Sequence, residues 1–261
     1  MIYLLLQVFV FCFGTVIGSF LNVVIWRLQT KESFIFSRSY CPYCRHVLSI
    51  LDLIPLMSFL FLKGKCRYCS LKINPSYFVI ELTVGLLFLL CALQIFSPTE
   101  VSISVEALMR LLVWWYLMSI LVIIFVYDLR HMLILQSVTL PATIIIFVVN
   151  LLLGMSWWSL FSGMIIGAGF FWLQYQLSQG KWIGGGDIYL GLLMGAVLGF
   201  PKILLALFIA YISGSAVGLL LMLMRKKSLQ SELPFGTFLS VATVITVLFG
   251  DSIFTWYLSW L

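Results

Sequence analysis

The sequence predicts an all-α polytopic membrane protein of about eight transmembrane helices, with a small four-cysteine module in the loop between the first two. Hydrophobic residues make up 63% of the 261 residues and charged residues only 9%, far outside the proportions of soluble domains. Apolar runs long enough to cross a bilayer, which takes about 20 residues, recur along the chain. The four cysteines lie where this hydrophobic pattern breaks up.

Eight apolar runs mark the expected spans. In chain order they cover residues 2–26, 77–96, 109–127, 135–153, 158–177, 187–200, 203–224 and 235–250. The first lacks the basic start of a secretory signal and runs as far as Arg27, so we expect it to be a retained helix. We therefore expect three parts: a first transmembrane helix (1–26), a cysteine module (27–76) and a membrane-embedded domain (77–261).

The run that begins at Asp187 is short. Its 14 residues would make a helix of about 21 Å. A bilayer core is about 30 Å thick. We therefore expect Trp182 and Ile183 to extend this helix.

The distribution of basic residues predicts the topology. Eight of them lie in the first loop, namely Arg27, Lys31, Arg38, Arg45, Lys63, Lys65, Arg67 and Lys72. The positive-inside rule makes this loop cytoplasmic. Eight spans then place Arg130, Lys181, Arg225, Lys226 and Lys227 on the same side, and only Arg110 and Lys202 outside. The net charge of +6 is thus explained by the orientation of the chain in the lipid bilayer, and it predicts no nucleic-acid partner. Both termini face outward.

Four cysteines form two pairs in this cytoplasmic loop, Cys41-Pro42-Tyr43-Cys44 and Cys66-Arg67-Tyr68-Cys69. The 21 residues between the pairs are typical of a four-thiolate zinc site. In a reducing cytoplasm the cysteines would be metal ligands rather than disulfides, with free thiols or a redox pair as the alternatives. Four sulfur ligands leave no position for water, so the predicted zinc is structural.

Two carboxylates lie at the ends of different apolar runs. Asp128 ends one run and Asp187 begins another, 59 residues later. Both would open on the cytoplasmic side. A carboxylate at the edge of the membrane is by default a hypothesis of function. Each also has a structural interpretation. Asp128 could cap a helix end or pair with Arg130, and Asp187 could mark a helix N-terminus, where the macrodipole favours it.

The two carboxylates could meet in the folded bundle. Two like charges a few ångströms apart cannot both ionise, so the pair would share a proton. The ionised member would activate water as a general base, and the protonated member would polarise the scissile carbonyl. Gly184-Gly185-Gly186 carries no side chains, so an extended substrate could approach Asp187 closely. These residues predict an aspartic protease.

Glycines repeat every four residues in several spans. Gly191, Gly195 and Gly199 would lie on one helix face, and small residues at this spacing let transmembrane helices pack closely. We expect this face to bring Asp187 toward the helix that ends at Asp128. The same spacing occurs in Gly14/Gly18, Gly163/Gly167 and Gly214/Gly218.

No rival catalytic set is evident in the sequence. His46 and His131 have no serine or cysteine partner at a recognisable spacing, and we expect His46 to lie on the surface of the cysteine module. The chain has no P-loop and no metalloprotease histidine pair.

Several motifs together resemble those of the type IV prepilin peptidases, membrane aspartyl proteases of the GxGD class. They are Gly18-Ser19-Phe20-Leu21-Asn22-Val23-Val24-Ile25-Trp26-Arg27-Leu28, the two cysteine pairs, Ile54-Pro55-Leu56-Met57-Ser58, Lys63-Gly64-Lys65-Cys66, Glu81 and Gly184-Gly185-Gly186-Asp187. The resemblance covers nearly the whole chain.

The resemblance implies a specific reaction. The short basic leader of type IV prepilin or pseudopilin precursors would be cleaved after a glycine, at the cytoplasmic face of the bacterial inner membrane. Asp128 and Asp187 would be the catalytic pair, and the zinc ligands would be Cys41, Cys44, Cys66 and Cys69. Many members also methylate the new N-terminus with S-adenosylmethionine, an activity tied to the cysteine domain. The clients would be pili, secretion pseudopili or a DNA-uptake apparatus.

The chain departs from the family pattern at three places. Gln29 follows Arg-Leu where proline is common, and Leu133-Ile134-Leu135-Gln136 stands where Ile-Pro-Asp often follows the first aspartate. Pro234-Phe235-Gly236-Thr237-Phe238 replaces Pro-Phe-Gly-Pro-Phe. None of these changes removes a catalytic group, so they affect substrate positioning. The cysteine module has no Gly-rich nucleotide-binding loop that would by itself indicate methylation.

Two other functions fit parts of the sequence. A proton-coupled or cation transporter would use intramembrane carboxylates, but the inverted repeats common in transporters are not detectable here. A membrane scaffold organised by zinc would explain the cysteines but not the triple glycine.

Overall fold

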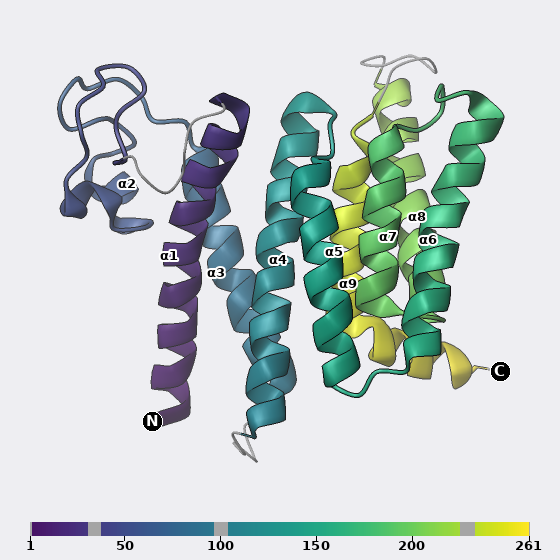
Figure 1. Cartoon of the computed structure of the whole chain (residues 1–261). Coiled ribbons are helices and arrows are strands. Elements are labelled where there is room, and N and C mark those ends of the chain that lie inside the picture. The colour runs from purple at the N-terminus through teal and green to yellow at the C-terminus, as the bar shows by residue number, and fades with distance from the viewer. Residues whose placement is uncertain (1, 31–37, 97–103, 225–232, 261) are drawn as a thin grey trace. The chain divides into compact units, whose positions relative to one another are not determined.

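The computed structural model describes residues 2–30, 38–96, 104–224 and 233–260 (Figure 1). Its elements are α1 (Ile2–Thr30), the 3-10 helix η1 (Ile50–Leu53), α2 (Met57–Phe61), α3 (Ser76–Ile95), α4 (Val105–His131), α5 (Gln136–Leu152), α6 (Trp157–Ser178), α7 (Gly185–Leu198), α8 (Lys202–Leu223) and α9 (Phe235–Leu258). The predicted all-α fold is confirmed, and each expected apolar run falls largely within one of these helices. Lys31, Arg225, Lys226 and Lys227, which enter the predicted topology, lie outside the described residues.

Five described helices are long and apolar enough to cross a membrane. These spans are Tyr3–Thr30 in α1, Ser76–Ile95, Val105–His131, Lys202–Leu223 and Phe235–Leu258. The helices α5 and α7 are apolar but shorter. The protein is therefore a multi-pass membrane protein.

The expected extension of α7 by Trp182 and Ile183 is wrong. The helix begins at Gly185 and ends at Leu198, so it keeps a length of 14 residues. Its start is set by the Asp187 side chain, which accepts a hydrogen bond from the Gly184 N–H (3.1 Å) and so satisfies a donor that precedes the helix. At the other end, Gly199 has φ +63° and ψ −179°, a backbone conformation almost confined to glycine that departs from the helical path.

The chain forms two compact units, residues Met1–Ser119 and Ile120–Leu261, with α4 contributing to both. The division of the chain at residues 26 and 76 stays a prediction.

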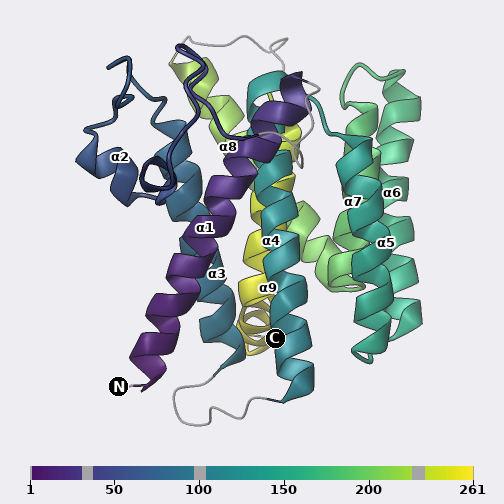
Figure 2. The ribbon, with the colours of Figure 1, turned by 60° about the vertical axis from the view of Figure 1, so that its left-hand side comes forward.

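In the first unit α1 and α3 lie side by side (Figure 2). Gly14 lets the helices approach so closely that a Cβ there would lie 2.9 Å from the Gly85 Cα, and Gly18 faces Glu81 in the same way. The Asn22 side chain also donates to the Tyr77 carbonyl (3.1 Å). Small residues and an interhelical hydrogen bond thus join two helices that are apolar over most of their surface.

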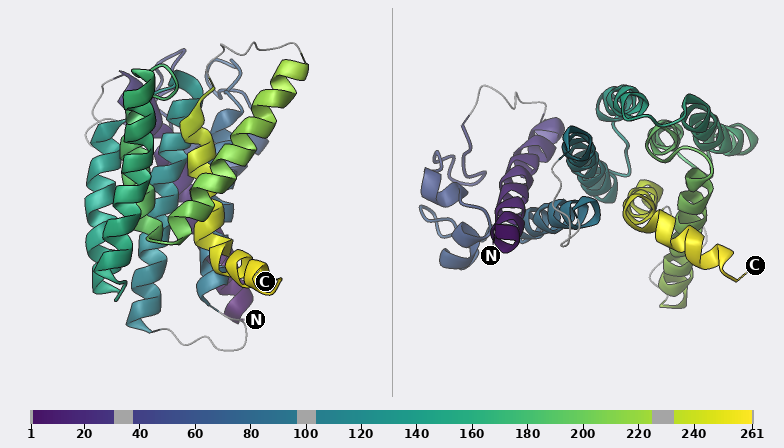
Figure 3. Two further views of the ribbon diagram at one scale, coloured as in Figure 1. Left: turned by 90° about the vertical axis from the view of Figure 1, so that its right-hand side faces the viewer. Right: turned by 90° about the horizontal axis from the view of Figure 1, so that it is seen from below.

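The second unit is built around α7, which contacts α5, α6, α8 and α9. Figure 3 shows α8 crossing α9 beside it. Helix α7 is buried along most of its length: Leu190, Leu193, Met194 and Ala196 are fully inaccessible to solvent. This central position places the N-terminus of α7, with Asp187, inside the bundle.

Candidate active site and metal centre

Asp128 lies in the last turn of α4 and is 4% exposed. Its Oδ2 accepts a hydrogen bond from the Thr237 N–H at 2.9 Å, and the Gly236 backbone also donates to the carboxylate. These residues belong to the first turn of α9, whose N–H groups have no partner within their own helix. Asp128 therefore caps a helix end, as its structural interpretation predicted, and the capped helix is α9.

Asp187 is the third residue of α7 and is 6% exposed. Besides accepting from the Gly184 N–H, it stands at the positive end of the α7 macrodipole. Its interpretation as a helix N-terminal residue is thus also confirmed. The carboxylates of both aspartates thus lie at helix N-termini, that of Asp128 at the start of α9 and that of Asp187 at the start of α7, where a negative charge is stabilised.

One side chain lies between the two helix starts. Ile134 follows α4, and a Cβ on Gly186 would lie 2.8 Å from its Cβ, whereas a Cβ on Gly236 would lie 3.0 Å from its Cδ1 and 2.9 Å from Asp128 Oδ2. A side chain at 186 would clash with the base of Ile134, and one at 236 would displace the Asp128 carboxylate, so glycine at both helix starts lets α7 and α9 close around Ile134. In this arrangement the carboxylates of Asp128 and Asp187 come close enough to interact electrostatically.

The glycine face of α7 does not make this approach, contrary to our expectation. Gly191 and Gly195 lie against Gly167 and Gly163 of α6, so close that each backbone occupies the space of the other's missing Cβ. Asp187 is instead brought near Asp128 by the packing of the starts of α7 and α9 against Ile134. The glycine spacing does predict close helix packing, but it cannot tell which helix is the partner.

Tyr211 and Gln174 were not among the predicted site residues. Tyr211 interacts electrostatically with Asp187, and its hydroxyl donates to Gln174 Oε1 at 2.8 Å. The Gln174 Nε2 is buried with no hydrogen-bond partner among the described residues. Polar side chains within the apolar runs of α6 and α8 were the available signal, since such residues usually face the bundle interior.

The two cysteine pairs form the same backbone turn twice. The Arg45 N–H donates to the Cys41 carbonyl (2.8 Å), and the Ser70 N–H donates to the Cys66 carbonyl (2.9 Å). The residue after each second cysteine has positive φ, 55° at Arg45 and 59° at Ser70. Isolated bridges Tyr40↔Val47 and Lys65↔Lys72 close the two turns, which we call the first and second knuckle. The repeat aims both thiol pairs at one point.

The thiols of Cys41, Cys44, Cys66 and Cys69 lie within 4.8 Å of one another, and the Cys41 and Cys69 sulfurs are 4.0 Å apart. Four sulfurs 2.3 Å from a central ion in a tetrahedron are about 3.8 Å apart, so the cluster fits a four-thiolate metal site with a slight contraction. Burial opposes ionisation of Cys66, but N–H groups of Cys69 and Tyr68 and the neighbouring thiols outweigh it and lower its pKa to about 7. A thiolate, the form that binds metal, is therefore accessible near neutral pH.

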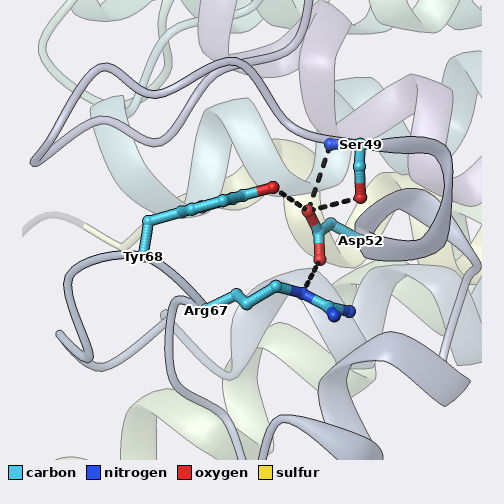
Figure 4. Close-up of polar contacts among 4 residues, drawn as sticks. All are labelled: Ser49, Asp52, Arg67 and Tyr68. Carbon is cyan, nitrogen blue, oxygen red and sulfur yellow. Dashed lines mark hydrogen bonds and ion pairs between the residues drawn. The ribbon is translucent and has the colours of Figure 1, made fainter.

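A second set of polar contacts joins the segment between the knuckles to the second knuckle (Figure 4). The Asp52 carboxylate accepts hydrogen bonds from the Ser49 N–H (3.1 Å) and hydroxyl (2.8 Å), from Arg67 Nε (2.7 Å) and from the Tyr68 hydroxyl (3.2 Å). Burial tends to raise the pKa of Asp52, but these donors outweigh it and hold that pKa below its ordinary value. The ring of Tyr68 also stacks on His46, which is exposed on the module surface as predicted.

We expect Asp52→Asn to destabilise the cysteine module. The Asp52 side chain is 3% exposed, whereas Arg67 is half exposed, so solvent screens part of the attraction and a loss of about 1 kcal/mol is expected. Because folding lowers the pKa, this stabilisation is complete above the ordinary pKa of an aspartate and disappears as pH falls through the lowered value. Thermal unfolding of both proteins at neutral and acidic pH measures the difference. A gap that widens toward acidic pH would contradict the assignment.

Comparisons with known proteins agree with this architecture. Residues 12–95 match the bacterial peptidase A24 N-terminal domain, and residues 115–219 match the type IV leader peptidase family. The chain is 33% identical over 280 residues to the prepilin leader peptidase/N-methyltransferase of Aeromonas salmonicida, covering 96% of this chain and 93% of the relative. It is 31% identical over 255 residues to the protein of that name from Bacillus subtilis, covering 95% and 96%. No solved structure matches the chain significantly.

The two matched regions account for different features of the structure. The N-terminal match contains both knuckles, α3 and most of α1. The second match contains Asp128, the triple glycine and Asp187. With relatives above 30% identity along nearly its whole length, the chain belongs to the type IV leader peptidase family.

Proposed function

We propose that Asp128 and Asp187 are the catalytic pair of a prepilin peptidase that removes the leader of type IV prepilin or pseudopilin precursors. The observation that carries the proposal is the convergence of two buried carboxylates on the starts of α7 and α9, which pack against Ile134 between them. Family membership supplies the class of reaction and of substrate.

The pair would act as one acid–base unit. One carboxylate holds a proton and polarises the scissile carbonyl, while the other accepts a proton from the attacking water. The bare backbone of residues 184–186 leaves room for an extended substrate beside Asp187. Gln174, which Tyr211 links to Asp187, has an unpaired Nε2 that could donate a hydrogen bond to a substrate carbonyl.

The proposed active site lies at the cytoplasmic face of a bacterial inner membrane. This orientation is supported by the sequence, in which thirteen of the fifteen basic residues fall on the side that carries the cysteine module. Threading eight spans from that side would also bring Asp128, at the C-terminal end of α4, and Asp187, at the N-terminal end of α7, to the cytoplasmic face. A precursor would therefore present its leader before translocation.

The test is a cleavage assay in membranes. A prepilin is co-expressed with the parent protein, with Asp128→Ala and with Asp187→Ala, and precursor is separated from product by gel mobility. We expect processing by the parent and none by either variant at a matched protein level. Retained processing by a variant would exclude the dyad. Failure of the parent on every prepilin tried, combined with proton-coupled uptake into liposomes, would favour a transporter instead.

We propose further that the four thiolates hold a structural zinc ion. The donor set and the doubled knuckle support zinc, because four sulfur ligands select soft or borderline metals and leave no open coordination position. The ion would fix the module's fold. Catalysis by the carboxylates needs no step at this site.

Metal analysis of the purified protein tests this site. We expect one zinc ion per chain, and loss of most of it in Cys66→Ser, which removes one of the buried ligands. Cys91→Ser is the matched control, since Cys91 is buried in α3 away from the cluster. Equal zinc content in the two variants would contradict the assignment.

Methylation of the new N-terminus is the second activity named for the relatives. We extend it to this protein as a proposal from family membership alone. The described residues of the cysteine module form no Gly-rich loop that would hold S-adenosylmethionine, so the structure supplies no methyl-transfer step.

A further inference from the structure

The segment between the knuckles carries a row of exposed apolar side chains, which we call the apolar ridge. Its members and their exposed fractions are Ile50 (85%), Leu51 (62%), Ile54 (42%), Met57 (48%), Leu60 (59%) and Phe61 (78%). They lie on η1, on α2 and on the turn between them. Contiguous apolar surface of this kind marks an interaction site.

The turn that joins η1 to α2 is strained and anchored. Leu56 has φ 60° and ψ −49°, and the Met57 N–H donates to the Pro55 carbonyl (2.6 Å), the geometry of a classic γ-turn. Such turns are rare and must be held by their surroundings. The Leu56 N–H donates to Glu81 Oε2 of α3 at 2.8 Å, and Glu81 is 9% exposed. A buried carboxylate of a membrane helix thus fixes the position of the ridge.

This anchor places the ridge at the edge of the bilayer. Helix α3 has 20 residues and so is about 30 Å long, just enough to span the hydrocarbon core. Glu81 lies five residues, or about 7.5 Å, inside its cytoplasmic end. Figures 1 and 2 show α2 beside the upper half of α3, and the bond from Leu56 to Glu81 ties the start of α2 to this depth. At this level an unpaired backbone N–H would be costly, and Glu81 supplies its acceptor.

The charges beside the ridge also fit a lipid surface. Lys63 and Lys65 come just after α2 and are exposed. The membrane helices α1 and α3 also expose apolar side chains, among them Phe20 (50% exposed) and Val79 (55%). An apolar strip bordered by basic residues is the pattern of segments that lie in the interface of anionic bilayers.

We propose that the apolar ridge is a membrane-docking surface, inserted into the boundary between headgroups and acyl chains on the module's side of the bilayer. Glu81 is its positioning residue. The docking would hold the cysteine module against the membrane whether or not a precursor is bound, and it does not depend on the proposed peptidase chemistry.

The test measures the depth of Phe61 in the full-length protein, reconstituted into liposomes of phosphatidylethanolamine and phosphatidylglycerol. A fluorescent amino acid replaces Phe61, or, in the matched control, Tyr43, an exposed aromatic residue (66%) of the first knuckle outside the ridge. Lipids with a nitroxide near the headgroup and a water-soluble quencher are then compared. We expect the lipid nitroxide to quench the label at 61 more strongly than the aqueous quencher does, and the reverse at 43.

Two other occupants would give different results. Quenching at 61 by the aqueous agent alone, or by neither agent, would overturn the proposal in favour of a free surface or one covered by protein. Loss of lipid quenching on addition of a prepilin would assign the ridge to the substrate instead. Glu81→Leu, which removes the acceptor, should shift the label toward water, whereas Glu81→Gln, which keeps an acceptor oxygen, should restore depth. Equal depth in both variants would remove Glu81 from this role.

Discussion

Replacement of either Asp128 or Asp187 by asparagine is expected to lower the rate of prepilin cleavage by about 10²- to 10⁴-fold, the usual contribution of a positioned acid or base. Asparagine keeps an oxygen that can accept from the Thr237 N–H or the Gly184 N–H, and it caps helices as well as aspartate does. It cannot exchange the proton that the reaction requires. The measurement is the initial cleavage rate of a purified prepilin in detergent.

A matched variant separates chemistry from stability. Asp251→Asn removes an exposed carboxylate of α9 that pairs with Lys202 (2.7 Å), far along the helix from Thr237. We expect its cleavage rate to equal that of the parent. Full activity in Asp187→Asn would refute the dyad, and equal loss in Asp251→Asn would show that the assay reports stability.

Gly167→Ala is expected to disrupt the second unit. Its Cβ would overlap the Gly191 carbonyl, which is backbone and cannot turn aside. Overpacking of this kind costs about 1 to 3 kcal/mol. Because α6 supports the helix that carries Asp187, we expect a lower thermal transition in detergent together with reduced cleavage.

The control lies two residues along the same helix. A Cβ on Gly169 would meet nothing within 4 Å, so Gly169→Ala should leave the thermal transition unchanged or raise it slightly, since alanine favours helix by about 0.5 to 1 kcal/mol. Similar losses in the two variants would mean that the contact between α6 and α7 is not the cause.

Periodic and spaced features could be predicted from the sequence. The apolar runs predicted the helices. The paired cysteines, spaced as in metal sites, predicted the cluster of four thiols that the structure contains. These features are local or depend on one loop. The end of each helix was harder to place, as at Trp182 and Ile183, because the start of α7 is fixed by one side-chain hydrogen bond.

Partners between distant segments could not be predicted. Ile134 meets Gly186 and Gly236 because three chain segments converge, and no spacing in the sequence encodes that convergence. Glu81 was noticed only as part of a family motif, and its bond to the Leu56 N–H emerges only when the cysteine module is folded against α3. Long-range contacts to backbone groups leave no pattern of residue types.

Thr237, one of the departures from the family pattern, supplies a backbone N–H that bonds the Asp128 carboxylate. The position is often proline in the motif that this chain reads as Pro234-Phe235-Gly236-Thr237-Phe238. Proline fits the first turn of a helix but has no N–H to donate. Threonine therefore supplies a hydrogen bond to Asp128 that proline could not make, and a donor of this kind stabilises negative charge on a carboxylate. Threonine at this position thus ties the end of α4 to the start of α9 through the Asp128 carboxylate, a link that a chain with proline here would lack.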